Sequence, residues 1–318
     1  MLEIRRRLRQ GGVLGINQRN AEFIRRLNPR RLYPLVDDKL RTKELAVAAG
    51  MPVPELFGVI STQHGIRTLP ELVAERDQFV VKPAHGSGGN GVLVITGRRG
   101  SLFYKSSGAL LDERELGHHI SNMLSGLYSL GGQRDRVLVE YYVRCDPILE
   151  EVSYRGVPDI RLVVLNGYPV MAMIRLPTRL SDGRANLHQG AVGVGIDLVE
   201  GRTLDGVLDN QVVTEHPDTG HRLAGLRVPA WERILKMAAL CHDMTGLGYL
   251  GVDIVIDRDL GPLILELNAR PGLNIQIANC AGLIHRLRLV EEQGAATPFA
   301  DDRLEFCRRY FRHQPVAS

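Results

Sequence analysis

Short turns between apolar, strand-like runs restrict the fold of this chain more than any other feature of its sequence. Asn166-Gly167 separates residues 159–165 from residues 169–175, and Asn-Gly is the strongest short-range signal for a two-residue hairpin turn. A second hairpin is predicted from residues 249–257 and 262–268. Both pairs require antiparallel neighbours, so much of the chain is expected to form antiparallel sheet.

Helical patterns are interleaved with these hairpins. Asp37 and Asp38 are suitable N-cap residues for a helix over residues 39–49. Capping-box spacing predicts a second helix over residues 112–130, and a third begins near Trp231. Further strand-like runs lie at residues 79–83, 92–96 and 136–143. Hairpins and helices follow one another in mixed order, so an α+β fold with helices covering antiparallel sheets fits better than a doubly wound parallel sheet.

The second hairpin places two carboxylates opposite each other. With its turn centred between Asp259 and Leu260, Asp253 faces Glu266, and strand alternation puts Asn268 on the same side as Glu266. Opposed side chains lie about 5 Å apart, where like charges repel unless a cation lies between them. Oxygen ligands suit Mg²⁺ or Mn²⁺ rather than zinc. These residues therefore predict a divalent metal site. The alternative is a solvent-facing hairpin with incidental acids, and a one-residue slip of register would undo the geometry.

A glycine-rich segment follows Lys82. Residues 85–91 read His-Gly-Ser-Gly-Gly-Asn-Gly and join two predicted strands. Backbone N–H groups of such a loop can approach phosphate oxygens closely, and a lysine adds a point charge. The segment lacks a GKS or GKT ending, so it is not a Walker A loop. A phosphate cover and an ordinary surface loop both remain open.

Arginine dominates the basic residues, because only five of the 40 are lysines. Four arginines lie at the ends of predicted strands or shortly after them, and the planar guanidinium suits fixed anions because it binds two oxygens at once. They are Arg161, Arg175, Arg184 and Arg270. Any one of them is more typical of a surface residue, but together they indicate an anionic ligand.

The first 31 residues carry nine arginines against Glu3 and Glu22, a local net charge of +7. This arm is interpreted either as a solvated helix face or as a docking surface for phosphate, nucleic acid or an acidic protein. Nucleic acid is the less favoured partner, because only Phe23 and Tyr33 are available for base stacking.

The composition excludes several classes of protein. With 44% hydrophobic and 24% charged residues, the chain is neither disordered nor collagen-like. No apolar run reaches the roughly 18 residues that a membrane span requires. The four cysteines lie far apart without a CxxC pair, which argues against a zinc site or a disulfide framework and favours a cytoplasmic location. They are Cys145, Cys241, Cys280 and Cys307.

Five segments in order resemble the ATP-grasp superfamily, most closely its RimK-type glutamate ligases. They are DDKLRTKELAVAAGMPVPE, FVVKPAHGSGGNGV, VLVEYYV, DIRLVVLNGYPVMAMIRLPTRLSDGRANLHQGA and GYLGVDIVIDRDLGPLILELNARPGL. The resemblance runs from about residue 37 to about residue 280. It implies two α+β subdomains whose antiparallel sheets hold ATP between them. It also implies ATP and two Mg²⁺ ions as cofactors, with Mn²⁺ as a substitute.

The resemblance further assigns residues to the nucleotide site. Those implied to bind the nucleotide are Lys39, Lys82, His85, Gly86, Ser87, Gly88, Gly89, Glu140, Tyr141, Asp159, Arg184 and Asn186. Among them the lysines would contact phosphates, residues 85–91 would cover these, and Glu140 and Tyr141 would form the adenine-side hinge. Asp253, Glu266 and Asn268 match the two-metal site, with Glu266 bridging the ions. Arg175 and Arg270 are the predicted catalytic residues.

The sequence departs from the family pattern before residue 39, where members usually carry a further small α/β domain. The predicted organisation is an arginine-rich extension at residues 1–36, an ATP-grasp domain at 37–295 with lobes 37–140 and 141–295, and a tail at 296–318. The pre-grasp domain is expected to be shortened or missing. An insertion at residues 146–158 and the arginine at position 270 are further departures from RimK-type sequences.

The resemblance implies an ATP-dependent carboxylate-amine ligase. A substrate carboxylate would attack the γ-phosphorus of ATP to give an acyl phosphate, and an amine would then displace phosphate to form an amide. The predicted reaction adds an amino acid such as glutamate to a peptide or small-molecule acceptor, and an acidic partner is expected for the arm. The alternatives are a small-molecule kinase on the same scaffold and a non-catalytic nucleotide-sensing or RNA-binding module. The sequence does not indicate an oligomeric state.

Overall fold

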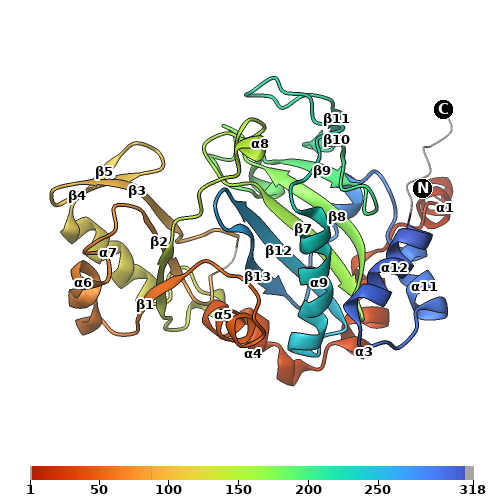
Figure 1. The fold of residues 1–318 in the computed structure, drawn as a ribbon, viewed down its shortest axis with the longest axis horizontal. Helices are drawn as coiled ribbons and strands as arrows, with labels where there is room; N and C mark the ends of the chain where they lie inside the picture. The colour runs from red at the N-terminus through yellow and green to blue at the C-terminus, as the bar shows by residue number, and fades with distance from the viewer. Residues whose placement is uncertain (1, 87, 312–318) are drawn as a thin grey trace. The chain divides into compact units, whose positions relative to one another are not determined.

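The computed structural model describes residues 2–86 and 88–311, and the chain divides into two compact units. One unit comprises residues 1–37, 45–52 and 144–318, and is called the large unit below. The other comprises residues 38–44 and 53–143, and is called the small unit. Helix α5 (Lys39–Ala48) contributes residues to both. Each unit is built on its own antiparallel sheet, which confirms the predicted α+β class (Figure 1).

The small unit has a six-stranded sheet in the order β1-β6-β2-β3-β4-β5. Its strands are β1 (Leu56–Ile60), β2 (Phe79–Pro83), β3 (Leu93–Arg99), β4 (Leu102–Lys105), β5 (Leu110–Leu111) and β6 (Val137–Tyr141). Its helices are η3 (His64–Thr68), α6 (Leu69–Leu72), α7 (Glu113–Leu124) and η4 (Leu130–Gly132). The predicted loop after Lys82 joins the paired strands β2 and β3. The glycine-rich segment is therefore a hairpin connection.

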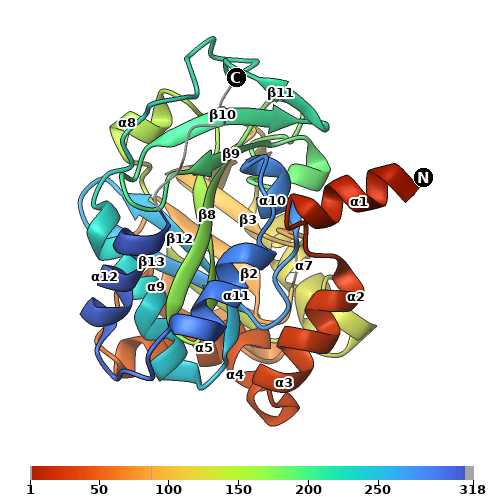
Figure 2. The same ribbon diagram turned by 90° about the vertical axis from the view of Figure 1, so that its right-hand side faces the viewer.

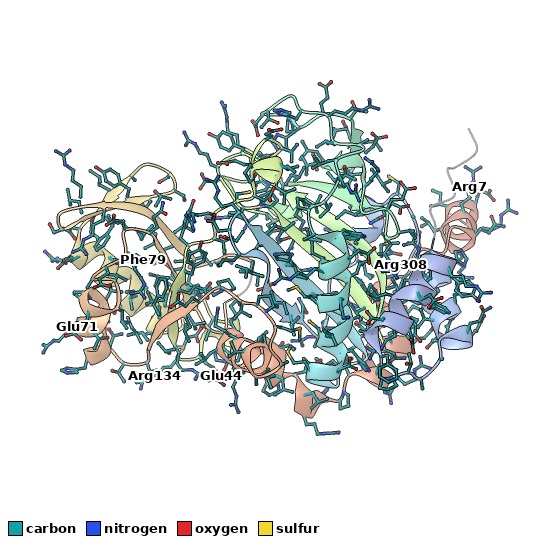
Figure 3. All side chains as sticks on the ribbon, in the orientation of Figure 1. Arg7, Glu44, Glu71, Phe79, Arg134 and Arg308 are labelled. Carbon is teal, nitrogen blue, oxygen red and sulfur yellow. The ribbon has the colours of Figure 1, made fainter. Side chains whose placement is uncertain are left out.

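The core of the small unit lies between α7 and the sheet. Leu116, Ile120 and Met123 of α7 are fully buried with Phe79 and Val81 of β2. Figure 3 labels Phe79 within this unit. The capping box that starts α7 is confirmed, because Asp112 accepts from the Glu115 N–H and the Glu115 side chain accepts from the Asp112 N–H.

The predicted end of this helix near residue 130 is wrong, because α7 ends at Leu124. Gly126 has φ +88°, and its N–H donates to the Met123 carbonyl at 2.9 Å. Glycine adopts this left-handed conformation at little cost, and it is the usual way in which a helix ends. The glycine pair at 131–132 lies beyond the true stop.

The large unit has a seven-stranded sheet in the order β11-β10-β9-β8-β7-β12-β13. Its strands are β7 (Asp159–Leu165), β8 (Tyr168–Leu176), β9 (Val192–Ile196), β10 (Thr203–Leu208), β11 (Gln211–Val213), β12 (Tyr249–Asp257) and β13 (Gly261–Asn268). Helix α9 (Trp231–Thr245) contacts β7, β8 and β12 (Figure 1). Two predictions are confirmed here: α9 begins at Trp231, and Asn166-Gly167 turns β7 into β8 with both residues at positive φ.

The remaining helices of the large unit come from the two ends of the chain and from connections. The N-terminal ones are α1 (Leu2–Gln10), α2 (Ile16–Gln18), the π-helix η1 (Arg19–Ile24), α3 (Arg25–Leu27), η2 (Arg30–Leu32) and α4 (Pro34–Asp37). The others are α8 (Pro147–Glu150), η5 (Leu187–Gln189), α10 (Asn274–Ala278), α11 (Ile284–Gln293) and α12 (Ala300–Tyr310). Helix α1 extends away from its neighbours (Figure 2), and Arg7 projects from it (Figure 3). No helix within the described residues is both long and apolar enough for a membrane span.

The hairpin of β12 and β13 has the predicted pairing at the end that carries the two carboxylates. Asp253 pairs with Glu266, but nearer the turn the register differs, because Asp257 pairs with Gly261. The register shifts between Asp253 and Ile254, because Asp253 pairs with Glu266 whereas Ile254 pairs with Ile264. Strand β13 therefore has one extra residue at this point, which is a β-bulge. The predicted turn is therefore one residue too long, and the bulge restores the opposition of the two carboxylates.

Candidate active site

The large unit gathers two carboxylates and two guanidiniums on adjacent strands. Asp159 pairs with Arg175 across β7 and β8, and Asp253 of β12 pairs with Arg161 of β7. The Arg161 guanidinium donates to both oxygens of Asp253, and Arg175 donates to both oxygens of Asp159. Nη2 of Arg175 also lies 3.0 Å from Oδ2 of Asp253. The four side chains form one continuous ion-pair network, called the β7–β12 network below.

Burial and charge act in opposite directions on this network. Burial raises the pKa of Asp253, but Arg161 and Arg175 outweigh it and bring that pKa to about 2. Burial also raises the pKa of Asp159. Arg175 lowers this pKa, the nearby Asp253 charge raises it, and the result is a pKa of about 6. Burial tends to lower the Arg175 pKa, yet the two carboxylates raise it. Asp253 therefore stays ionised at neutral pH.

The β7–β12 network neutralises the Asp253 charge without a metal ion. The sequence suggested that Asp253 and Glu266 would repel each other without a cation, but guanidinium groups already neutralise Asp253. Among the described residues there is no cluster of three or more histidine, cysteine or acidic side chains arranged to hold a metal. Glu266 and Asn268 remain half-buried on alternate positions of β13, and their oxygens are of the kind that hard cations prefer. The donor chemistry at the end of β13 thus fits Mg²⁺, with Asp253 held in place by arginine.

The turn after β13 carries the second predicted catalytic arginine. The Arg270 N–H donates to Oδ1 of Asn268 at 2.8 Å, so the metal-ligand candidate also orders the backbone of this turn. The Arg270 guanidinium lies over the ring of Tyr33 and within 3.4 Å of Asp37. Arg270 is exposed on its side chain and belongs to the same end of β13 as Glu266 and Asn268.

Two other candidates lie in the connection that follows β8. Arg184 is exposed, and its N–H donates to the Ser181 carbonyl. The Asn186 side chain accepts from the His188 N–H and caps η5. Neither residue belongs to the β7–β12 network.

In the small unit, a buried carboxylate is held by two lysines. Lys82 of β2 forms an ion pair with Glu140 of β6, and Nζ of Lys43 lies 3.0 Å from Oε2 of Glu140. Burial raises the Glu140 pKa, but Lys82 and Lys43 reverse the shift and lower it. Burial likewise lowers the Lys43 pKa. The Glu140 carboxylate is therefore engaged with lysine, while the neighbouring Tyr141 donates its backbone N–H to the Glu55 carbonyl at 2.8 Å.

The glycine-rich loop is anchored at its first residues. Nδ1 of His85 lies 2.7 Å from the buried Asp135, and the Lys39 ammonium donates to the Gly86 carbonyl. Burial raises the Asp135 pKa, but hydrogen bonds from Ser129 and His85 lower it overall. The loop therefore starts from a fixed ionised carboxylate.

The middle of the loop requires glycine. Gly88 and Gly89 have φ +64° and +78°, and a Cβ on Gly89 would meet no atom within 4 Å. An open backbone of this kind can approach an anion closely. Ser87 lies outside the described residues.

Sequence reasoning missed several residues that complete these clusters. Arg161 was noticed only as one strand-end arginine, whereas the structure makes it the main partner of Asp253. Lys43 and Asp135 were not singled out, although each holds a predicted site residue. The scarcity of lysine in this chain was the one signal that pointed toward Lys43.

One family model covers most of the chain. The family model described as "Sugar-transfer associated ATP-grasp" matches residues 18–292. A curated relative, the probable alpha-L-glutamate ligase of Enterobacter sp. (strain 638), is 26% identical over 236 residues, which cover 74% of this chain. The chain spans 56% of the length of that relative.

Solved structures resemble the chain at lower identity. A D-cycloserine synthetase is 18% identical, with 86% of this chain and 73% of that chain covered at a TM-score of 0.47. The D-alanine–D-alanine ligase from Bacillus anthracis is 16% identical, with 86% and 70% covered at a TM-score of 0.47.

Proposed function

Because this chain belongs to the sugar-transfer associated ATP-grasp family, we propose that it is an ATP-dependent ligase that joins a carboxylate to an amine. The observation that carries the proposal is the β7–β12 network beside Glu266 and Asn268. Phosphoryl transfer needs positioning and neutralisation of charge more than a protein nucleophile. Fixed guanidiniums, carboxylates and amide oxygens supply such an environment.

The small unit is proposed to bind the phosphates of ATP. Lys39 and Lys82 supply positive charge, and the backbone of residues 85–91 approaches phosphate oxygens where Gly88 and Gly89 leave it open. Glu140 holds Lys82 in position through a buried ion pair. Glu140 and Tyr141 are proposed to form the hinge on the adenine side of the nucleotide. Ser87 belongs to the same loop by sequence alone.

The large unit is proposed to supply the reaction centre. Glu266 and Asn268 would hold Mg²⁺, and Asp253 would support the site through its contacts with Arg161 and Arg175. When bound, Mg²⁺ neutralises phosphate oxygens and polarises the γ-phosphoryl group. Asp159, Arg184 and Asn186 remain proposed nucleotide contacts.

The reaction is proposed to proceed in two steps. The substrate carboxylate attacks the γ-phosphorus, the bond to the bridging oxygen of ADP breaks, and an acyl phosphate forms. An amine then attacks the acyl carbon, phosphate leaves, and the amine loses its proton. Arg175 and Arg270 offset negative charge that develops during transfer. An amino acid such as glutamate is the proposed substrate, and the acceptor is a peptide or a small molecule.

The test is ADP release by the full chain with MgATP, screened against amino acids and peptide C-termini, with products identified by mass spectrometry. We expect release that depends on both a carboxylate and an amine, and a product that contains a new amide. Glu266→Gln should abolish release, whereas Asp259→Asn, which alters an exposed acid in the turn of the same hairpin, should not. A phosphorylated end product would instead indicate a kinase. Failure of ATP to turn over with any pair would refute the ligase assignment.

A further inference from the structure

The N-terminal part of the chain packs on the turn that follows β13. Nδ2 of Asn28 donates to the Ala269 carbonyl at 2.8 Å and to the Tyr249 carbonyl at 2.6 Å, so it joins the start of β12 to the end of β13. Nη1 of Arg19 donates to the Pro271 carbonyl at 2.6 Å. The residues on either side of Arg270 are therefore both held by side chains from far earlier in the sequence, within one unit.

Arg270 itself is held by the same N-terminal part. Its guanidinium carbon lies 5.2 Å from the ring centroid of Tyr33, a cation–π distance. Its Nη2 lies 3.4 Å from Oδ2 of Asp37, whose side chain is 40% exposed. Two side chains from the chain's beginning thus orient the arginine that sequence analysis placed at the reaction centre.

Arg19 brings a second positive charge to this turn. Its Nε and Nη2 donate to Oδ1 of Asn20, and its Nη1 donates to Pro271, but these partners are neutral. Burial lowers the Arg19 pKa, and the positive charge of Arg270 lowers it further against an opposing effect of Tyr249. Because Nη1 of Arg19 donates to the carbonyl of Pro271, the residue that follows Arg270, both arginines lie at the same turn. The half-exposed carboxylate of Asp37 neutralises these two positive charges only weakly.

A buried polar group at the start of β12 lacks a hydrogen-bond partner within the part of the chain that the structure describes. The Tyr249 hydroxyl is fully buried and has no hydrogen-bond partner among the described residues. Buried hydroxyls normally have a partner, so the Tyr249 hydroxyl is an unused hydrogen-bonding group at this end of β12.

We infer that Arg19 and Arg270 form a two-guanidinium site for an oxyanion of the substrate, with Tyr33 as the positioning residue for Arg270 and Asp37 as a carboxylate that competes with the oxyanion for it. Guanidiniums suit this role because each offers a fixed fork of donors to carboxylate or phosphoryl oxygens. The inference rests on the proposed function for the identity of the anion, which is either the substrate carboxylate or the transferred phosphoryl group. It gives a role in the site to Arg19, one of the nine arginines within the first 31 residues.

The test uses inorganic phosphate as the probe and the full chain without nucleotide, with binding measured by titration calorimetry. Arg19→Gln and Arg270→Gln should each weaken phosphate binding by about tenfold or more, since each removes charge-assisted hydrogen bonds. Asp37→Asn should strengthen binding, because it removes the carboxylate that competes for Arg270. A purely structural role for these residues would not produce a gain. Arg25→Gln, an exposed change on α3, is the matched control and should bind as the wild type does.

Two results would overturn the inference. One is wild-type phosphate affinity in Arg19→Gln, and the other is unchanged or weaker binding in Asp37→Asn. If circular dichroism shows that Arg19→Gln does not fold, the phosphate affinity of Asp37→Asn decides the test. The Asp37 side chain is exposed, so this variant is expected to fold.

Phosphate titrations in the presence of nucleotide distinguish the two sources of the anion. If the site takes the phosphoryl group, phosphate binds alongside MgADP and is displaced by a non-hydrolysable MgATP analogue. If it takes the carboxylate, the analogue leaves phosphate binding unchanged and glutamate competes with it. Arg19-dependent phosphate binding without any ADP release would refute the ligase but keep the site. Full ligase activity with an unchanged carboxylate KM in Arg19→Gln would refute the site but keep the ligase.

Discussion

Replacing Arg161 by methionine should destabilise the large unit strongly, because it removes the main partner of a buried charge. Asp253 is only 1% exposed, and Arg161 donates to both of its oxygens. Breaking a buried ion pair from one side costs about 3–5 kcal/mol of unfolding free energy. Nη2 of Arg175 stays 3.0 Å from Asp253, so we expect a value at the lower end, about 3 kcal/mol.

The measurement is urea unfolding followed by tryptophan fluorescence. The chain has one tryptophan, and Trp231 lies in α9 of the large unit, so its emission reports the unit that contains the pair. The matched control is Arg144→Met, which breaks an exposed pair with Asp259. Exposed pairs contribute about 0–1 kcal/mol, so this control should change little.

The pH dependence of the difference provides a second check. The folded-state pKa of Asp253, about 2, lies below the value of about 3.9 for an unfolded aspartate. A carboxyl group shifted in this direction contributes stability above the unfolded pKa and loses it as pH falls toward the folded pKa. The gap between wild type and Arg161→Met should therefore be largest at neutral pH and shrink between about pH 4 and pH 2. A cost below about 1 kcal/mol, equal to that of the control, would refute the reasoning.

Three further changes test other parts of the molecule. Lys82→Ala should weaken ATP binding strongly, whereas Lys105→Ala should not; equal nucleotide affinities by calorimetry would show that the glycine-rich loop is structural. Replacing the four arginines within residues 5–9 by glutamine should raise the acceptor KM and leave the ATP KM nearly unchanged. The salt dependence of the acceptor KM should also become shallower, because exposed charges are screened beyond about 8 Å at physiological ionic strength; identical KM values and salt slopes would exclude recruitment by the arm. Gly126→Ala should lower the thermal midpoint of the small unit, because φ is +88° and the new Cβ would lie 2.1 Å from the Gln133 carbonyl oxygen; an unchanged midpoint would contradict this account of the helix end.

Features that depend on neighbouring residues were predictable. The Asn166-Gly167 hairpin and the capping box at Asp112 involve residues two to four positions apart, so local backbone preferences determine them. The opposition of Asp253 and Glu266 was also predictable, because a short turn limits the register of a hairpin. The observed pairing of Asp253 with Glu266 nevertheless depends on a β-bulge that no local sequence pattern predicted.

The partners of the site residues were decided only by the tertiary structure. Strand alternation indicates that Asp253 and Arg161 lie on polar faces, but it does not indicate that β7 and β12 are neighbours. These two residues are 92 positions apart, and Asn28 and Ala269 are 241 apart. Such contacts follow from strand order and from the burial of apolar faces, which are properties of the whole chain. The sequence by itself therefore determined the hairpins, the helix starts and the opposed carboxylates, whereas folding decided which charges neutralise them and which early residues hold Arg270.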